Sequence, residues 1–245
     1  MTSEAGTPHA IVVGITARTG RAIAAHLAEA GWSIEGTARD VQAATVEIDR
    51  LSERGHRAAS LDLADQDSID RFLEDRTGSP GADLLVIAGA PFVETPLARA
   101  TMKDFLHQAA AQAAGPALVA SGVASELARS NRPGGGAVIL FGDIHARLRP
   151  RAGATPYLTG KAGLESLVAL LAVELAPIRV FGIAPGVIAW AEEFDEARRA
   201  DYLQRVPLGR AGTVEEAAAL VRALVDSATY TTGIVIPIDG GRHLR

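Results

Sequence analysis

The chain has 245 residues, 48% of them hydrophobic and 22% charged, which is enough apolar material for one sizeable core. Its formal net charge of -5 argues against nucleic acid or an anionic membrane as the main partner, because both select basic surfaces. The sequence has no cysteine, which excludes disulfides, thiolate catalysis and cysteine metal sites.

Strand-like apolar runs alternate with helical patterns along almost the whole chain. The predicted strands are, in order, 10–15, 33–38, 58–63, 83–90, 136–142, 178–186 and 233–241. The predicted helices between them are 20–31, 41–55, 66–78, 101–130, 156–176 and 214–226. Strands that are apolar enough to be covered on both faces, each followed by a helix, predict an α/β fold with one doubly wound, Rossmann-type parallel sheet flanked by helices.

The same alternation predicts a single domain over residues 10–245, preceded by a flexible N-terminus at 1–9. No internal repeat is present, and "RPGGGA" at 132–137 is typical of a turn between a helix and a strand. Two polar stretches after strand ends, 145–154 and 189–212, are expected to be the most mobile. We expect the second to be the substrate loop.

The stretch "VVGITARTGRAIA" places Gly14 at the end of the first strand and Gly20 at the start of a helix. Small residues there let the backbone approach a pyrophosphate, which the free N–H groups of the helix N-terminus attract. We therefore expect Thr16, Arg18 and Thr19, which lie between the two glycines, to bind a dinucleotide. Glycines also simply end strands, and the middle glycine of the usual motif is absent.

Two arginines indicate which dinucleotide the loop binds. Arg18 lies inside the loop, and Arg39 follows the second strand, where an enzyme that uses NAD would place an acid on the ribose hydroxyls. Arginine at that point suits a 2′-phosphate, so the sequence predicts NADP(H). The alternative is NAD, because Asp40 lies only one position after the place where an NAD enzyme has its acidic residue. Asp62 and Leu63, at the end of the third strand, are well placed for an adenine amine and ring.

In "TPYLTGKAG", Tyr157 and Lys161 stand four positions apart. On a helix this spacing brings both side chains to one face, so the two could share one site. The plainer interpretation is an amphipathic helix with a Tyr and a Lys at its edge.

Together these stretches resemble the short-chain dehydrogenase/reductase family from about Ala10 to Leu244. The resemblance rests on the glycine loop, "LDL", the Tyr-x-x-x-Lys pair, "APG" at 184–186 and "TGIVIPIDGG" at 232–241. Within the family the chain is most similar to the pteridine reductase-like branch. The arginine form of the loop, "PFVETPL" after the fourth strand, the Asp in "FGDIH" and the ending "PLGRAGTVEEAAALV" carry that similarity.

The resemblance implies that Tyr157 is the general acid and that Lys161 lowers its pKa and holds the nicotinamide ribose. Asp143 stands where most members have a catalytic serine, and in the pteridine branch this aspartate joins in protonating the substrate. It lies fourteen positions before Tyr157, one more than usual. Further cofactor contacts are implied for Ala88, Gly89, Pro185, Gly186 and Ile188.

The chain also departs from the family pattern. The usual Asn-Asn-Ala-Gly is "IAGA" at 87–90, the asparagine that holds a relay water is matched by Gln112, and Val13 replaces a threonine. Buried strand positions tolerate apolar replacements, which favours ordinary reduction. Alternatively, the proton relay is impaired and the chemistry has drifted to dehydration, cyclisation or isomerisation. A dinucleotide-sensing regulator is a third hypothesis, against which the retained Tyr157 and Lys161 argue.

We therefore expect an NADPH-dependent reductase of a carbonyl or C=N bond in a small cyclic, pterin-like or secondary-metabolite substrate. Phe92, His145 and Trp190 follow strand ends and are expected to line the substrate pocket. No second histidine stands at metal spacing, so no metal site is predicted. The apolar helices 101–130 and 156–176 predict a homotetramer or homodimer. The first ten residues lack the pattern of a signal peptide and no apolar run could span a bilayer, so a soluble cytoplasmic protein is expected.

Overall fold

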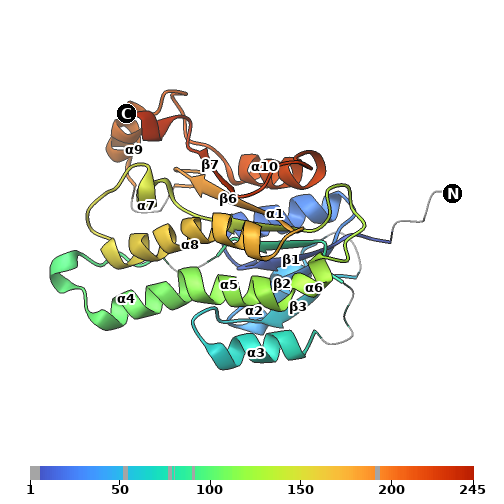
Figure 1. Ribbon diagram of the computed structural model, residues 1–245. Coiled ribbons are helices and arrows are strands. Elements are labelled where there is room, and N and C mark those ends of the chain that lie inside the picture. The colour runs from blue at the N-terminus through green and yellow to red at the C-terminus, as the bar shows by residue number, and fades with distance from the viewer. Residues whose placement is uncertain (1–5, 52–54, 77–78, 80, 90–91, 191–193) are drawn as a thin grey trace.

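Seven parallel strands form one sheet in the order β3-β2-β1-β4-β5-β6-β7 (Figure 1). The computed structural model describes residues 6–51, 55–76, 79, 81–89, 92–190 and 194–245, so the first part of the predicted flexible N-terminus, Ala90 and part of the predicted substrate loop lie outside it. The strands are β1 His9–Val13, β2 Ser33–Ala38, β3 Arg57–Ser60, β4 Leu84–Ile87, β5 Ala137–Phe141, β6 Arg179–Pro185 and β7 Ile234–Ile238. Because all of them run the same way, their carboxyl ends meet at one edge.

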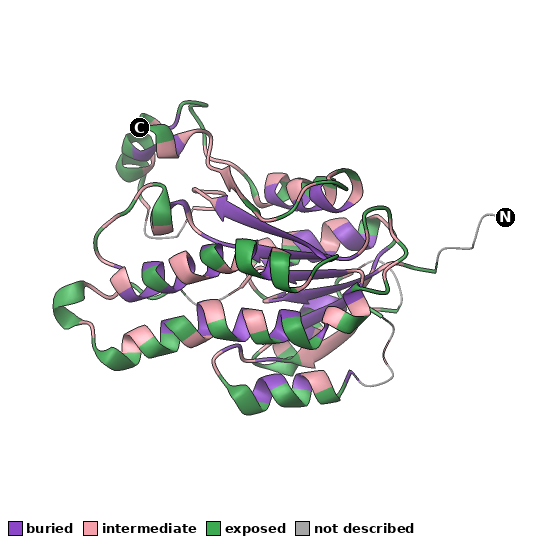
Figure 2. Cartoon of the chain, in the orientation of Figure 1, coloured by how far each residue is buried: buried purple, intermediate pink, exposed green. Residues whose placement is uncertain are grey.

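Alternate residues of the strands enter two different cores. Ala10 and Val12 of β1 belong to one cluster, whereas Ile11 and Val13 belong to the other. The first cluster lies under α1 (Arg18–Glu29), α2 (Val41–Ile48) and α10 (Val214–Ser227), and the second lies under α3 (Gln66–Glu74), α5 (Gly115–Gly122) and α8 (Thr155–Glu174). Helices therefore cover both faces of the sheet, as Figures 1 and 2 show, and the predicted fold class is confirmed.

The predicted helix over 101–130 is wrong as one continuous element. It is divided into α4 (Met102–Ala109), a π-helical turn η2 (Ala110–Ala114), α5 and α6 (Ala124–Leu127). Pro116 has no N–H to donate to the carbonyl of Gln112, so the regular hydrogen-bond ladder is broken at this point. A Cβ on Gly115 would lie 2.0 Å from the Leu63 carbonyl oxygen, which shows how closely the irregular helix approaches the chain after β3.

The helix predicted at 41–55 is shorter, because α2 ends at Ile48. The polar stretches 145–154 and 189–212 are not wholly irregular, because they contain α7 (Ile144–Arg147) and α9 (Glu196–Leu203). Each of these two helices begins at an aspartate, Asp143 or Asp195, whose carboxylate accepts a backbone N–H of the first turn. The remaining short elements are the 3₁₀ turns η1 (Leu97–Arg99) and η3 (Arg242–Leu244).

A buried ion-pair network lies at the amino-terminal end of the sheet. Glu35 in β2 is fully buried and pairs with Arg76 and with Arg57, whose Nη2 is 2.8 Å from Glu35 Oε1. Arg76 is also buried and pairs on its other side with Glu126. Burial, with Arg76 and Arg57 nearby, lowers the pKa of His9 to about 4, so this histidine is neutral at neutral pH. The charges of Glu35 and Arg76 are therefore matched inside the protein.

Replacing Arg76 with methionine is expected to lower the free energy of unfolding by about 3 kcal/mol, because it removes the buried cation that pairs with both Glu35 and Glu126. Urea denaturation measures this. The control is Arg71→Met, which removes an exposed ion pair whose N–O distance is 3.9 Å and should change the free energy by less than about 1 kcal/mol. Equal effects of the two substitutions would contradict this assignment.

Candidate active site

The glycine loop after β1 touches the segment after β4. Gly14 has a φ of 85°, and a Cβ on it would lie 2.5 Å from the Gly89 Cα. A Cβ on Gly20 would lie 2.2 Å from the Gly14 carbonyl oxygen. Both positions therefore require glycine. A side chain on Gly14 would push the loop away from Gly89, and one on Gly20 would push α1 away from the loop.

The N-terminus of α1 is open toward this loop. Ala17 precedes the helix and provides no side-chain cap, so the first N–H groups of α1, including that of Thr19, remain available to an anion. Arg18 reaches across the site, because its Nη1 donates to the carbonyl oxygen of Trp190 at 2.6 Å. The loop and the segment after β6 are thus joined by a direct hydrogen bond.

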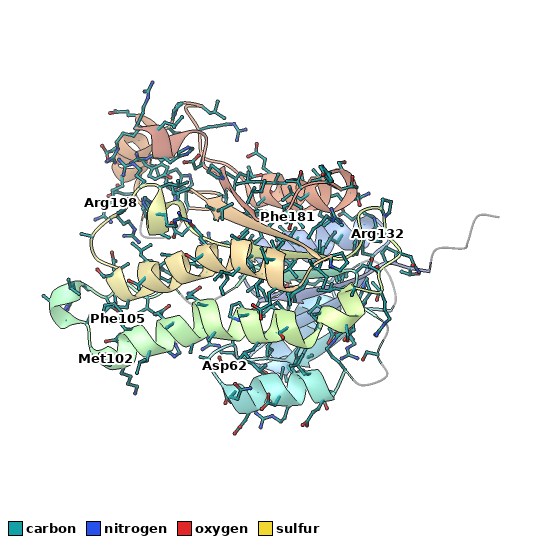
Figure 3. The ribbon with its side chains drawn as sticks, in the orientation of Figure 1. Asp62, Met102, Phe105, Arg132, Phe181 and Arg198 are labelled. Carbon is teal, nitrogen blue, oxygen red and sulfur yellow. The ribbon has the colours of Figure 1, made fainter. Side chains whose placement is uncertain are left out.

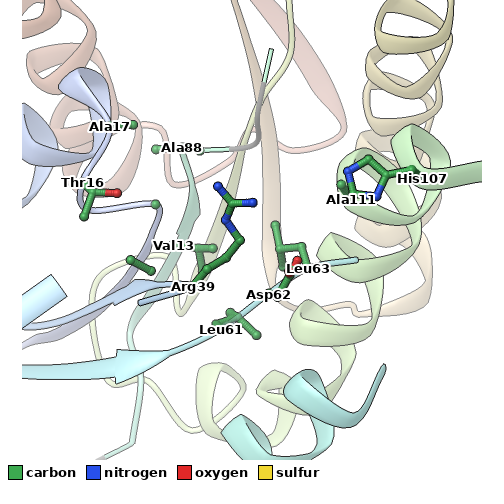
Figure 4. Close-up of a pocket in the computed structure, with 13 residues that line it drawn as sticks. Val13, Thr16, Ala17, Arg39, Leu61, Asp62, Leu63, Ala88, His107 and Ala111 are labelled. Carbon is green, nitrogen blue, oxygen red and sulfur yellow. The ribbon is translucent and has the colours of Figure 1, made fainter. Parts of the chain in front are cut away.

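A cavity of about 300 Å³ lies beside the loop, at the carboxyl ends of β1 to β4 (Figure 4). It is lined by predicted cofactor residues on three sides. These are Gly14, Thr16, Arg39, Asp62, Leu63, Ala88 and Gly89. His107 and Ala111 complete the wall from α4 and η2, and the sequence interpretation missed both because it singled out only Gln112 in the predicted helix 101–130.

Arg39 points into this cavity between Thr16 and Asp62 (Figure 4). The neighbouring Asp40 has a different task, because its Oδ1 accepts the backbone N–H of Gln42 and caps α2. Asp62 is held by its own turn, since its Oδ1 accepts the N–H of Ala64 at 2.9 Å. The cationic side chain of Arg39, which follows β2, therefore lines the cavity.

Tyr157 and Lys161 share one face of α8, as their spacing predicted, and both are buried. The Tyr157 hydroxyl donates to Asp143 Oδ2 at 3.4 Å, and the Lys161 Nζ donates to the Phe141 carbonyl oxygen at 2.6 Å. The ammonium lies 5.9 Å from the centre of the tyrosine ring. Three of the four residues predicted to be catalytic, Asp143, Tyr157 and Lys161, therefore meet at the end of β5.

The direction of the Tyr157 pKa differs from the sequence prediction. Burial, and then the carboxylate of Asp143, raises the pKa of the phenol, whereas Lys161 was expected to lower it. The reason is geometric, because the Lys161 ammonium donates to the Phe141 carbonyl oxygen while the carboxylate of Asp143 faces the phenol. Tyr157 is therefore protonated at neutral pH. Burial also lowers the pKa of Lys161 from 10.5 to about 8.

Glu165 is a buried acid that the sequence analysis missed. Its Oε1 accepts the backbone N–H of Asp143 at 3.2 Å, and a Cβ on Gly142 would lie only 2.6 Å from that oxygen. Burial raises the pKa of Glu165. The only available signal was its position four residues after Lys161, on the same helix face, next to a glycine that follows β5.

Gln112 is fully buried in η2, beside α8. Its Nε2 donates to Gln108 Oε1 at 3.2 Å, whereas its own Oε1 has no hydrogen-bond partner among the described residues. A Cβ on Gly160 would lie 3.0 Å from the Gln112 side chain, so the glycine makes room for it. An unpaired buried carbonyl oxygen is a place for a water molecule, as the sequence predicts.

The predicted carboxamide-binding segment follows β6. Gly186 donates its N–H to the Ile238 carbonyl oxygen at 3.0 Å, and the Val187 N–H is donated to the Tyr202 hydroxyl oxygen at 3.1 Å. A Cβ on Gly186 would lie 2.8 Å from the Asp239 Cβ, so this backbone is closely packed. Tyr202, from α9, thus holds the segment that contains Pro185 and Ile188, a role that the sequence did not reveal.

The three predicted substrate residues have different surroundings. Phe92 packs edge-on against Tyr157 with ring centres 4.9 Å apart, so it adjoins the proposed acid. The His145 Nδ1 lies 2.7 Å from the Arg149 carbonyl oxygen within the turn that contains α7. Trp190 packs against Phe194 and Tyr202, 5.5 Å from each ring centre. Only Phe92 is in contact with Tyr157.

The described part of the chain contains no group of three or more His, Asp or Glu side chains that could hold a metal ion. None of its helices has both the length and the apolar character needed to cross a membrane.

Known proteins resemble this chain over almost its whole length. Residues 14–243 match the family model described as Enoyl-(Acyl carrier protein) reductase. The chain is 30% identical to the 3-oxoacyl-(acyl-carrier-protein) reductase FabG of Pseudomonas aeruginosa, covering 96% of this chain and 97% of that one. It is 28% identical to the NADPH-dependent aldehyde reductase-like protein of Arabidopsis thaliana, over 95% and 93% of the two chains. The acetoin dehydrogenase of Enterobacter cloacae has a similar structure, with a TM-score of 0.83, 27% identity and coverage of 98% and 97%.

The lowered pKa of Lys161 predicts a pH dependence of stability. Between pH 8 and 10.5 the unfolded chain holds the lysine proton and the folded chain does not, so this group makes folding more favourable as the pH rises. Lys161→Met should remove that gain. Urea titrations of both proteins at pH 8 and at about pH 10 measure it, and the parent should gain stability relative to the variant. A constant difference between the two proteins would rule out the shifted lysine.

Proposed function

This chain is an oxidoreductase of the short-chain dehydrogenase/reductase family, and from that premise we propose that it is an NADPH-dependent reductase of a carbonyl or C=N bond in a small cyclic substrate. The observation that carries the proposal is the hydrogen bond between Tyr157 and Asp143, beside the glycine cradle and at the same edge of the sheet. A protonated phenol at that edge is a suitable general acid.

The residues present fit a dinucleotide. The backbone contact of Gly14 with Gly89 leaves no side chain in the way, and the uncapped start of α1 provides N–H groups for the pyrophosphate. Asp62 and Leu63 would hold the adenine, and the segment from Pro185 to Ile188 would hold the carboxamide. When bound, the nicotinamide supplies a hydride to the carbon atom of the substrate.

Arg39 is the reason for preferring NADP(H). Its guanidinium points into the cavity, whereas Oδ1 of the neighbouring Asp40 is used in capping α2. A guanidinium pairs with a phosphate through two parallel hydrogen bonds. The Arabidopsis relative, named as NADPH-dependent, is consistent with this choice.

The protein's own groups would move the proton. Tyr157 would donate its phenolic proton to the substrate oxygen or nitrogen as negative charge develops there, and the hydroxyl, which donates to Asp143 Oδ2 in the structure, would turn toward the substrate to do so. In the pteridine reductase-like branch the matching aspartate joins in protonating the substrate, and Asp143 would have that role here. Lys161 would hold the nicotinamide ribose and the end of β5, to which it already donates. Gln112 would hold a water molecule at its unpaired Oε1.

A pterin-like or secondary-metabolite substrate is our proposal for the substrate class. Phe92 offers a half-exposed ring next to Tyr157, on which a flat heterocycle could stack. The aspartate at position 143, in place of a serine, is the residue that likens the chain to the pteridine reductase-like branch.

A second candidate function is dehydration, cyclisation or isomerisation with the dinucleotide retained. The carboxylate of Asp143 facing Tyr157 favours it, because it raises the pKa of the phenol and is itself a suitable general base. In that case Asp143, and not Tyr157, would be the essential group.

We also propose a homotetramer or homodimer in a soluble, cytoplasmic setting. The outer faces of α4, α5 and α8 carry exposed apolar side chains, and Figure 3 shows Met102 directed outward from α4. The main ones are Met102, Leu106, Leu118, Leu170 and Val173. Such a face is typical of a contact between subunits. Light scattering at micromolar concentration should therefore give a multiple of the 25.4 kDa chain.

The cofactor choice can be measured by fluorescence titration. The parent protein should bind NADPH clearly more tightly than NADH, because only NADPH carries the 2′-phosphate. Arg39→Ala should weaken NADPH by about 1–3 kcal/mol and leave NADH almost unchanged. Equal dissociation constants of the parent for both cofactors would refute the assignment.

The proton donor is tested with Tyr157→Phe, which keeps the ring and removes the hydroxyl. Turnover of a ketone found by screening with NADPH should fall by roughly 10²–10⁴-fold, while NADPH affinity is retained. Asp143→Asn should cost less if the aspartate only orients the phenol. If Asp143→Asn abolishes turnover and Tyr157→Phe does not, the second candidate function becomes the better one.

A further inference from the structure

Arg151 lies one aromatic ring away from the proposed acid. Its guanidinium carbon is 5.4 Å from the centre of the Phe92 ring, and that ring packs edge-on against Tyr157. The Arg151 side chain is one-third exposed, and Phe92 is about half exposed. A positive charge therefore lies against the aromatic ring that contacts the proposed acid.

The guanidinium has only a weak partner in the described part of the chain. Its Nη1 lies 3.5 Å from Glu94 Oε1, and the Glu94 side chain is 61% exposed. An exposed pair at this distance contributes little to stability, so the fold does not account for an arginine at this position. Arg149, two residues earlier, differs because its Nε donates to the Arg245 carbonyl oxygen at 2.7 Å.

The position of Arg151 suits recognition of an anion. With Phe92 beneath the guanidinium, most of its N–H donors remain free of partners among the described residues, and a planar fork of donors matches a carboxylate. Stacking also fixes the side chain in advance, so little rotational freedom is lost when a ligand binds. Glu94 then occupies the place that the carboxylate of a ligand would take.

We propose that Arg151 is a specificity-determining residue that binds a carboxylate of the substrate, one aromatic ring away from the carbonyl that Tyr157 protonates. The substrate carboxylate displaces Glu94 from the guanidinium. This inference rests on the proposed reductase function, and it narrows the substrate class to cyclic ketones or imines that carry an anionic group.

The test compares two ketones with the same ring, 3-oxocyclohexanecarboxylate and its methyl ester, each reduced with NADPH. The parent should show at least a ten-fold higher kcat/KM for the acid, and the preference should shrink as salt is added. Arg151→Met keeps an apolar stem on Phe92 without the charge. It should bring the ratio close to one, chiefly by raising KM for the acid.

Two further variants sharpen the comparison. Glu94→Gln removes the competing carboxylate and should raise the preference for the acid above that of the parent. Arg147→Gln removes an exposed charge from the same segment, away from Phe92, and should leave the preference unchanged. An equal loss in the Arg147 and Arg151 variants would mean that only the general positive potential matters, and would overturn the specific role of Arg151.

The failures of the two proposals are distinguishable. Turnover of both ketones by the parent with equal kcat/KM overturns the anion site and leaves the reductase function intact. If the parent turns over neither ketone, the reductase proposal fails for cyclic ketones. The role of Arg151 is then tested by ligand binding instead of turnover. Calorimetric titration with cyclohexanecarboxylate and with cyclohexanecarboxamide should then show a preference for the acid that Arg151→Met removes; equal binding of the two compounds overturns the inference.

Discussion

The site depends on one close contact between two backbones. Gly14 and Gly89 touch where β1 and β4 end, and β1 and β4 are also the pair from which the strand order departs in opposite directions. Because neither residue has a side chain, the loop after β1 can lie against the segment after β4, and the cavity remains open above them. Arg39, Asp62 and Ala88 all line that cavity from strands whose register is fixed by the same parallel sheet.

The sequence predicted the elements and residue pairs that follow from a regular pattern along a short stretch of chain. The strands and most helices follow from apolar alternation, and the Tyr157–Lys161 pair follows from helix geometry. It did not predict η2, because the break needs both Pro116 and the approach of Gly115 to Leu63, a tertiary contact. Helix α9 was also missed, since its residues are mostly polar and no apolar stripe marks it.

Some residues of the candidate site could be predicted from the sequence, and others could not. Asp143 could be placed because "FGDIH" resembles the family pattern after the fifth strand, whereas Glu165 looked like one more solvated residue of an amphipathic helix. Its burial comes from Gly142, which leaves space for a carboxylate under the start of α7. The direction of the Tyr157 pKa also could not be derived, because burial of the phenol and then the carboxylate of Asp143 raise this pKa, and helix spacing specifies neither.

The protein treats buried charge differently at the two ends of its sheet. At the amino-terminal end, Glu35 and Arg76 are paired and their neighbours complete the balance. At the carboxyl end, one ammonium, that of Lys161, stands near two carboxyl groups, those of Asp143 and Glu165. The first arrangement holds a fixed set of charges, whereas the second favours the uptake of a proton. A reaction that consumes a proton is therefore expected at the carboxyl end of the sheet.

The hydrogen bond from Arg18 to Trp190 has a consequence for how this sequence can vary. The acceptor is a main-chain carbonyl oxygen, so every amino acid at position 190 supplies it, whereas only the side chain of Arg18 supplies the donor. The segment after β6 can therefore diversify its side chains, as it adapts to new substrates, without losing its tie to the glycine loop. Substitutions at position 18 have no such freedom, so the tolerance to mutation of the two partners in this bond is unequal.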